Sequence, residues 1–373
     1  MKQKVLISQR VPAFFRKPFF EYLAKEVDLV VTSGEPIEKD SIKTFNCLSN
    51  GQFVKTEIIY CFGGKFWFDK NWKKNIETHR PDVVVLTPTP RMLSNYLVVK
   101  YCKKHSIRVV GWGMGKMPGM RRFQALVHQL LAKTLVKKLD GMICYSTAAR
   151  DYYVTTGMPK EKCKIAYNST DTLESEILFN KLRYEKELRE RINNQYGLDS
   201  ETFKVLFVGR LTRSKQVDAL ISALECFEPK VELIVVGDGV HLNALKELSS
   251  LMSYKVVFTG HKIGEELAEL FLASDVFVLP SLGGLAIHQA MSFGLPVIVS
   301  VGDGTERDLI DEGVNGFVFR EKDWSHLKEC INVALMDKEQ LKVMGRNSLL
   351  KVTRDVNINN MVCLFIGALT END

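Results

Sequence analysis

Two cations in the second half of the chain have the types and spacing best suited to chemistry. Residues 207–215 read FVGRLTRSK, so a predicted strand ends at Gly209 and is followed by Arg210 and Lys215. An arginine can fork two phosphate oxygens, and a lysine adds a point charge. The pair could therefore bind a diphosphate and stabilise it as a leaving group. The alternative is a solvated basic loop after a core strand, and these residues alone leave both interpretations open.

A glycine turn between a predicted strand and a predicted helix is the second candidate. Residues 279–291 read LPSLGGLAIHQAM, with Gly283 and Gly284 before the helix. Because glycine has no Cβ, such a turn lets backbone amides and the helix N-terminus approach an anion closely. Many glycine pairs before helices only pack. The turn becomes informative through Phe293 and Gly294, a helix stop that a further predicted strand follows at once.

Both candidate motifs must follow strands whose ends lie near the ligand. The sequence predicts one set of such strands in each half of the chain. Short β-rich apolar runs alternate with longer amphipathic segments, which is typical of a parallel sheet flanked by helices. The predicted strands cover residues 4–8, 27–32, 83–86, 108–110 and 141–145, then 204–208, 232–236, 255–259, 276–279 and 296–299. The predicted helices include 18–25, 93–105, 217–226, 240–251 and 264–273. Ligands bind such sheets beyond the carboxyl ends of the strands, so the site is expected between the two halves.

The boundary between the halves is expected near residues 172–200. Residues 174–195 are rich in Glu, Lys and Arg, which favours one solvated helix leading into the second domain. We therefore expect an N-terminal domain over residues 1–172, a linker helix over 173–200 and a C-terminal domain over 201–351. A last helix, about residues 352–373, is expected to pack back on the first domain.

The composition argues against several other classes of protein. At 373 residues and 46% hydrophobic content, the chain can form two ordinary domains. Its longest apolar runs fall far short of the ~20 residues of a membrane span, and its start lacks the pattern of a signal peptide. We therefore expect a cytoplasmic protein. The eight cysteines have no paired short spacing, which argues against a zinc site and a disulfide framework.

The net charge of +7 would suit an anionic donor, an anionic lipid surface or nucleic acid. No helix-turn-helix, Cys/His finger or aromatic RNA-binding pattern is present, so we expect no nucleic-acid partner. Residues 121–138 (RRFQALVHQLLAKTLVKK) could form a helix that lies on the inner face of an anionic membrane, although an apolar stripe usually faces its own core. The cations that could instead meet a pyrophosphate-linked lipid acceptor are Arg10, Arg16, Lys17, Arg121 and Arg122.

In the order and spacing of these motifs, the second half resembles the donor-binding domain of retaining glycosyltransferase family 4. That family has a Gly-Arg-Leu with a lysine five residues after the arginine, and then a Gly-x-Gly strand end. The chain has Gly209-Arg210-Leu211, Lys215 and Gly237-Asp238-Gly239. It continues in register with FTG at 258–260, ASDV at 273–276, AM at 290–291, GLPV at 294–297 and GVNG at 313–316. The first half resembles the family less tightly, at residues 16–20 and 166–171.

The resemblance implies an α/β protein of the GT-B type, in which two Rossmann-like, doubly wound domains face each other across a cleft. It implies a glycosyltransferase that moves a sugar, with retention, from a UDP- or GDP-sugar bound by the second domain. A glycan or lipid-linked acceptor would bind the first domain, in surface polysaccharide or glycolipid biosynthesis. No metal and no other cofactor is implied, because two cations and backbone amides can neutralise the diphosphate.

By the same resemblance, Arg210 and Lys215 would be the catalytic pair that grips the diphosphate. Gly284 and Leu285 would offer it backbone amides, and residues 261–263 would border the nucleobase. The expected substrate contacts are Gly209, His261, Lys262, Ile263, Ser281, Gly283, Gly284, Leu285, His288, Gln289 and, in the first domain, Arg16.

The chain departs from the family where members usually carry two glutamates and a cleft histidine. Ser281 and Gln289 stand at the glutamate positions, and Gln289 can still hydrogen-bond a ribose hydroxyl. His288 could add a donor contact, although a lone histidine at a helix start is more often structural. Met114 stands near the expected histidine and cannot accept a proton. The chain is thus a divergent member or a weakened enzyme, and two alternatives stay open: a catalytically silent GT-B partner of another transferase, and an epimerase or hydrolase of the same architecture.

Overall fold

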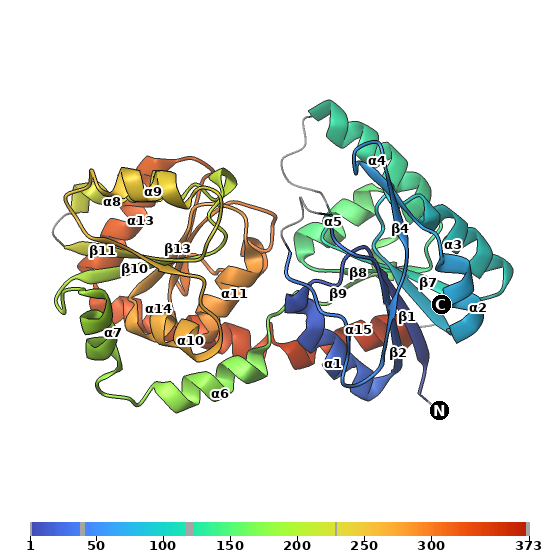
Figure 1. Cartoon of the computed structure of the whole chain (residues 1–373), viewed down its shortest axis with the longest axis horizontal. Coiled ribbons are helices and arrows are strands. Elements are labelled where there is room, and N and C mark those ends of the chain that lie inside the picture. The colour runs from blue at the N-terminus through green and yellow to red at the C-terminus, as the bar shows by residue number, and fades with distance from the viewer. Residues whose placement is uncertain (1, 38–41, 116–121, 228–229, 371–373) are drawn as a thin grey trace. The chain divides into compact units, whose positions relative to one another are not determined.

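The computed structural model describes residues 2–37, 42–115, 122–227 and 230–370. The chain divides into two compact units (Figure 1). The N-terminal unit comprises Met1–Thr170 and Ile358–Asp373, and the C-terminal unit comprises Asp171–Asn357. Each unit is an α/β layer structure around a parallel sheet, which confirms the predicted fold class. No described helix is both long enough and apolar enough to span a bilayer.

The N-terminal unit is built on a seven-stranded parallel sheet of order β3-β2-β1-β6-β7-β8-β9. Its strands are β1 (Lys4–Gln9), β2 (Asp28–Ser33), β3 (Gln52–Lys55), β6 (Val83–Leu86), β7 (Arg108–Gly113), β8 (Gly141–Cys144) and β9 (Cys163–Ile165). Every residue of β6 is buried, as expected of a central strand with helices on both faces. An antiparallel hairpin of β4 (Ile58–Cys61) and β5 (Phe66–Asp69) lies outside this sheet.

The helices of this unit follow the predicted alternation with strands. They are α1 (Lys17–Glu26), α2 (Trp72–His79), α3 (Ser94–Lys104), α4 (Arg122–Val136), α5 (Thr147–Thr155) and α15 (Ile358–Thr370). α15 is formed by the end of the chain, drawn in red in Figure 1, and it packs beside α1 through the edge-on contact of Phe365 with Phe19, whose ring centroids are 5.1 Å apart. The helix expected from about residue 352 therefore begins at Ile358.

The C-terminal unit has a six-stranded parallel sheet of order β12-β11-β10-β13-β14-β15. Its strands are β10 (Phe203–Val208), β11 (Val231–Val236), β12 (Val256–Gly260), β13 (Val276–Leu279), β14 (Val297–Ser300) and β15 (Gly316–Phe319). Its helices are α6 (Thr172–Leu182), α7 (Leu188–Tyr196), α8 (Val217–Leu224), α9 (Leu242–Ser249), α10 (Gly264–Ala273), α11 (Gly284–Ser292), α12 (Glu306–Leu309), α13 (Trp324–Met336) and α14 (Lys338–Arg354).

The strand order reverses within each sheet, because the chain moves outward in one direction from β1 or β10 and then in the other. The reversal lies between β1 and β6 in the N-terminal unit and between β10 and β13 in the C-terminal unit. Loops that leave two such strands separate from each other and open a crevice, which is where doubly wound sheets bind ligands.

The predicted linker helix over residues 173–200 is wrong in one respect, because it is two helices. α6 ends at Leu182, the chain turns, and α7 begins at Leu188. Both leucines are buried, whereas the charged residues between them are all exposed. Two separate anchors in the core therefore break what looks like one solvated helix in the sequence.

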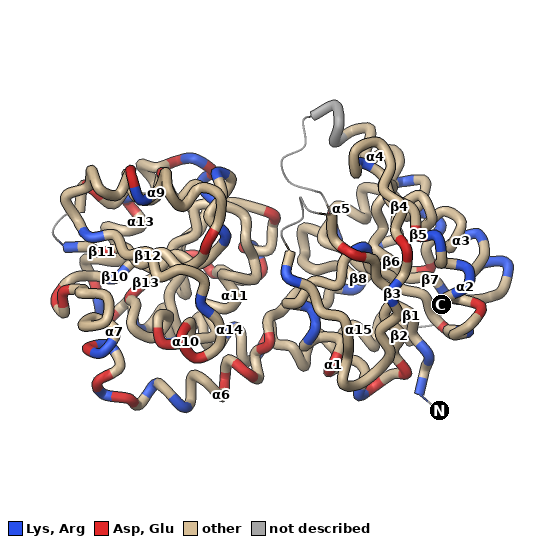
Figure 2. The backbone as a smooth tube through the Cα atoms, viewed as in Figure 1, with Lys and Arg blue, Asp and Glu red and all other residues tan. Residues whose placement is uncertain are grey.

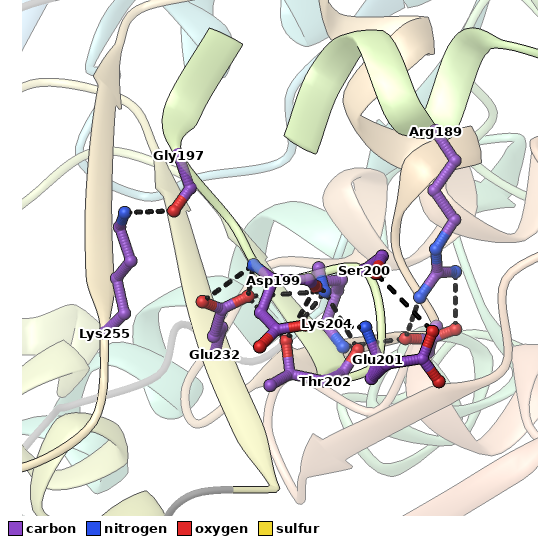
Figure 3. Close-up of polar contacts among 10 residues, drawn as sticks. Arg189, Gly197, Asp199, Ser200, Glu201, Thr202, Lys204, Glu232 and Lys255 are labelled. Carbon is purple, nitrogen blue, oxygen red and sulfur yellow. Dashed lines mark hydrogen bonds and ion pairs between the residues drawn. The ribbon is translucent and has the colours of Figure 1, made fainter. Parts of the chain in front are cut away.

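A buried polar cluster holds the amino end of β10 (Figure 3). Lys204 is fully buried, and its ammonium group donates to the carbonyl oxygens of Asp199 and Thr202 and to the Thr202 hydroxyl. Its Nζ also lies 3.3 Å from the Glu232 carboxylate, which itself accepts the Asp199 N–H. A buried charge is tolerated only when it is paired and hydrogen-bonded in this way. The cluster fixes the start of the strand whose other end carries Gly209.

Candidate functional site

The two motifs selected from the sequence follow the two strands at which the C-terminal sheet reverses. Gly209 to Lys215 leaves β10, and the glycine turn leaves β13. β10 and β13 are hydrogen-bonded neighbours, with Val205 opposite Val276. The loops therefore start side by side at the carboxyl edge of the sheet, where a ligand of this fold is expected.

Lys215 reaches across from its own loop to the glycine turn. It closes a single 3₁₀ turn, Arg213–Lys215, and its Nζ donates a hydrogen bond to the carbonyl oxygen of Leu282. A Cβ placed on Gly283 would lie 3.4 Å from that Nζ. The structure thus brings the lysine and the glycine turn together, as a site for one anion requires.

The electrostatics of Lys215 show that this position is partly withdrawn from water and close to another cation. Burial, and then the nearby charge of exposed Arg210, lower the pKa of Lys215, while Asp303 acts in the opposite direction. Two cations held near each other repel, and an anion between them would remove that cost. The arrangement therefore suits a ligand of more than one negative charge.

The first turn of α11 lies beside Lys215. No side chain caps this helix, and the N–H groups of Gly284 and Leu285 have no acceptor among the described residues, so they are left for a ligand. Gly284 is required here, because a Cβ at that position would come within 2.8 Å of Thr305 Cγ2. The helix N-terminus, with its partial positive charge, adds to the attraction for an anion.

Ser281 presents an unsatisfied polar group next to this turn. Its side chain is 8% exposed, and its hydroxyl has no hydrogen-bond partner among the described residues. Burying such a group without a partner costs free energy unless a ligand or water supplies one. A short hydroxyl cannot replace the reach of the glutamate expected at this position.

Glu306 was missed by sequence reasoning. It is 4% exposed, and its carboxylate accepts the N–H of Gly302 at 3.1 Å and of Gly304 at 2.9 Å. It thereby fixes the loop after β14, which supplies Asp303 and also Thr305, the neighbour of Gly284. The signal in the sequence was the Gly-Asp-Gly run followed by an acid, since close backbone approach needs glycine and its amides need an acceptor.

The expected donor contact of His288 does not agree with where its side chain lies. His288 is fully buried, and its Nε2–H donates to the carbonyl oxygen of Val356 at the end of the α14 region. Burial lowers its pKa to about 4, so the ring is neutral near pH 7. The histidine therefore has the structural role that was the alternative, because the helix turns it into the core of the unit. Gln289, one residue on, is half-buried.

The remaining expected contacts lie on other parts of the two units. His261 and Ile263 are exposed after β12, and Lys262 forms a 2.6 Å ion pair with Glu266 one helical turn later. In the N-terminal unit, the Arg16 guanidinium lies 4.4 Å from the Trp112 ring centroid and donates to the Tyr145 hydroxyl at 2.6 Å. Within the described residues, no three His, Cys, Asp or Glu side chains gather closely enough to hold a metal ion.

Comparison with known sequences finds a family model that matches part of the chain. Residues 189–350 match the family model described as glycosyl transferases group 1. An uncharacterized glycosyltransferase of Methanocaldococcus jannaschii is 25% identical over 297 residues, which are 75% of this chain and 73% of the relative. Sulfoquinovosyl transferase SQD2 of Arabidopsis thaliana is 32% identical over 174 residues, which are 45% of this chain and only 33% of the relative. This chain thus spans most of the first relative and about a third of the second.

Comparison with solved structures gives the fold over nearly the whole chain. Anabaena HepE in complex with UDP has a TM-score of 0.76 at 18% identity, covering 99% of this chain and 100% of that one. HepE has also been solved with UDP-glucose, with a TM-score of 0.71. Sucrose-phosphate synthase of Thermosynechococcus elongatus has a TM-score of 0.74 at 18% identity, covering 99% and 98%. The two Rossmann-like sheets therefore form the GT-B fold.

Proposed function

We propose that this chain, a glycosyltransferase of group 1 with the GT-B fold, moves a hexose from a nucleotide-diphosphate sugar to a glycan or lipid-linked acceptor with retention. The observation that carries the donor class is the contact of Lys215 with the glycine turn before α11. The acceptor and the place in surface polysaccharide or glycolipid assembly rest on the resemblance of the motifs.

Each part of the donor has a chemically matched group in this proposal. Arg210 and Lys215 bind the diphosphate with the amides at the start of α11, and Gln289 bonds a ribose hydroxyl. The UDP and UDP-glucose complexes of HepE support a nucleotide-sugar donor. Uridine and guanosine diphosphate sugars are both compatible with residues 261–263 as the border of the base.

The bond that breaks joins the anomeric carbon to the diphosphate oxygen, and the bond that forms joins that carbon to the acceptor oxygen. The acceptor proton passes to the departing phosphate, so no side-chain base is needed. As the bond breaks, negative charge builds on the leaving diphosphate, where the Lys215 ammonium and Arg210 guanidinium stabilise it. Removing one such charged donor should lower kcat by about 10²- to 10³-fold.

A thermal-shift panel of UDP, GDP, UDP-glucose and GDP-mannose tests the donor site. A ligand that binds only the folded chain raises its stability by about 2.7 kcal/mol at a hundredfold excess over Kd. We expect one nucleotide pair to raise the Tm of the wild type and to lose this effect in Lys215→Met. Arg213→Gln is the matched control, because Arg213 is an exposed cation of the same loop. An equal rise in Lys215→Met contradicts the assignment.

Turnover separates an enzyme from a silent partner. A transferase that binds the sugar nucleotide releases free nucleoside diphosphate when acceptor is supplied, or slowly to water without it. A silent partner binds the nucleotide and releases none, and an epimerase returns a changed sugar nucleotide with no free diphosphate.

The N-terminal unit also supports a peripheral contact with an anionic membrane. Leu126 and Leu130 of α4 are 55% and 57% exposed, and Leu97 of α3 is 45% exposed. The helices are adjacent, because the Tyr96 hydroxyl donates to the Leu131 carbonyl oxygen at 3.2 Å. α3 also carries three lysines (Figure 2). In the sequence, no Asp or Glu occurs between Asp82 and Asp140. An apolar face among cations suits an anionic leaflet.

A further inference from the structure

A second group of cations lies at the carboxyl edge of the N-terminal sheet. Arg10 directly follows β1, and Arg91 lies in the loop after β6. These two strands are the neighbours at which the strand order of this sheet reverses. The position therefore corresponds, in its own unit, to the one that Lys215 occupies in the other, and it is where a doubly wound sheet binds a ligand.

Both arginines have their guanidinium groups near the ring of Trp67, which belongs to the β4–β5 hairpin. The Arg91 Cζ is 4.6 Å from the Trp67 ring centroid, and the Arg10 Cζ is 5.4 Å from it. Arg91 is further fixed by hydrogen bonds from Nε to the Lys65 carbonyl oxygen at 2.6 Å and from Nη2 to that of Gly64 at 3.2 Å. These two bonds use two of the five guanidinium N–H groups. These bonds hold the guanidinium group in place and leave its other N–H groups unused by them.

Two buried polar atoms of the same cluster have no partner among the described residues. Trp67 is 8% exposed, and its Nε1–H finds no acceptor. His128 of α4 likewise has a buried Nε2 with no partner. Buried polar groups are normally satisfied by protein or by a bound molecule. Arg10, Trp67, Arg91 and His128 are here called the Trp67 cluster, and its indole N–H has no acceptor among the described residues.

The charges around the Trp67 cluster point to the sign of the missing group. Burial, and then the neighbouring charge of Arg10, lower the pKa of Arg91, and burial followed by Arg91 lowers the pKa of His128. Within the described parts of the chain, no carboxylate forms an ion pair with Arg91. The segment from Val83 to Leu139, which supplies Arg91 and His128, contains no Asp or Glu at all. The segment that carries Arg91 and His128 is thus positively charged and supplies no carboxylate to either residue.

We propose that the Trp67 cluster binds a phosphate group of the acceptor, so that the acceptor of this transferase is a phosphorylated glycan or a phosphate-linked lipid. The proposal rests on the proposed function, which gives the N-terminal unit to the acceptor. Two adjacent guanidinium groups are matched by a group of about two negative charges, which a phosphate monoester or a diphosphate has near pH 7 and a carboxylate does not. Arginine forks also fit phosphate oxygens in a bidentate way.

The indole N–H signals of the full chain provide a local test. The four tryptophans give four such signals, and the one that disappears in Trp67→Phe belongs to Trp67. Inorganic pyrophosphate, geranyl diphosphate and glucuronate are titrated in turn. We expect the Trp67 signal to move saturably with both diphosphates, and the affinity to fall by about tenfold or more in Arg91→Gln. A signal that stays fixed overturns the proposal, as does a glucuronate affinity equal to that of pyrophosphate.

The two diphosphates distinguish the sources of the phosphate. Tighter binding of geranyl diphosphate assigns it to a lipid-linked acceptor, and equal binding assigns it to a water-soluble phosphorylated glycan. The last titration uses vesicles of phosphatidylglycerol. If the Trp67 signal moves with the vesicles and with neither diphosphate, the proposal is wrong and the cluster contacts a membrane. Arg10→Gln serves as the second variant if Arg91→Gln unfolds, because Arg91 also holds two carbonyl groups of the hairpin.

Lys215→Met makes the two hypotheses separable. This variant should lose the nucleotide effect on Tm and keep the full Trp67 titration, because the two groups belong to different units. Loss of the Trp67 titration in Lys215→Met would show that the signal reports the donor site, and the proposed acceptor group would then be wrong.

Discussion

Arg189 and Asp275 form a two-pronged ion pair, with Nη1 donating to Oδ1 at 2.8 Å and Nη2 donating to Oδ2 at 2.9 Å. Arg189 belongs to α7, and Asp275 directly precedes β13. Asp275 also accepts the backbone N–H of Lys204 at 2.7 Å. The pair therefore joins the helix that leads into the C-terminal unit to the starts of β10 and β13, the two strands whose other ends carry the candidate donor site.

Removal of either partner of this ion pair should destabilise the C-terminal unit, and removal of Asp275 should cost more than removal of Arg189. Arg189 is 40% exposed, so solvent screens the pair, and Arg189→Gln should cost about 1 kcal/mol. Asp275→Ala should cost about 2 kcal/mol, because the Lys204 N–H also loses its acceptor. Urea unfolding of both variants measures this. Equal costs would mean that the backbone contact of Asp275 contributes nothing.

The Lys215 charge should make nucleotide binding sensitive to alkaline pH. Its folded-state pKa is below its ordinary value, so nucleotide affinity should fall as the pH rises through that lowered pKa. Lys215→Arg keeps its charge and should flatten the profile. Lys215→Met should bind nucleotide about 10- to 100-fold more weakly at pH 7. Calorimetric titrations with UDP or GDP between pH 7 and pH 10 measure both effects.

The same shift gives a stability test in the unliganded chain. Between the lowered folded-state pKa of Lys215 and its ordinary value, the unfolded chain holds more protons than the folded one. The free energy of unfolding should therefore rise with pH across that window. A rise of equal size in Lys215→Met would show that another group causes it.

His288 should make the C-terminal unit sensitive to acid. Its pKa is about 4 in the folded state, against an ordinary value of 6.5, so the unfolded chain binds the proton first as the pH falls. The free energy of unfolding should decrease from pH 6.5 to about pH 4, by about 3 kcal/mol in total from this group. Urea unfolding of wild type and His288→Gln over this range isolates the effect. His261→Gln, which removes an exposed histidine, is the control, and identical slopes in wild type and His288→Gln would contradict the prediction.

The exposed face of α4 should bind anionic vesicles. Leu126→Ser with Leu130→Ser removes two apolar side chains that would each contribute about 1.5–3 kcal/mol if fully buried, so the bound fraction should fall severalfold. Leu251→Ser is the matched control, since Leu251 is 77% exposed in the C-terminal unit. Sedimentation with phosphatidylglycerol vesicles measures binding. Insensitivity to added salt would remove the electrostatic part of this proposal.

Strand-level features were predictable because they depend on local pattern. Runs such as Val83–Leu86 and Val276–Leu279 are buried on both faces, and continuous apolar residues with flanking breakers mark such strands. The edge strands β3 and β9 were not predicted, since they are partly exposed and contain no continuous apolar run. The break between α6 and α7 was missed because it depends on where Leu182 and Leu188 find the core, which charged neighbours conceal.

The site residues that could be predicted were likewise those with a local signal in the sequence. Gly209, Lys215 and Gly283 could be selected because a strand end, a cation and a glycine turn are local chemical features. The burial of His288 could not be predicted, because its partner Val356 lies on a distant segment. Glu306 and Trp67 were also missed, since an acid that clamps amides and an indole that stacks on cations look like ordinary residues in the sequence.

The sequence by itself determined that two parallel α/β domains form and that a cationic loop and a glycine turn end two strands of the second one. Hydrophobic periodicity and glycine chemistry act between near neighbours along the chain, so a single sequence is enough to reveal them. Only the tertiary structure decided which groups meet: the Lys215 ammonium with the Leu282 carbonyl oxygen, and the guanidinium groups of Arg91 and Arg10 with the Trp67 ring. These meetings depend on the reversal of strand order within each sheet, which brings together loops that no local pattern connects.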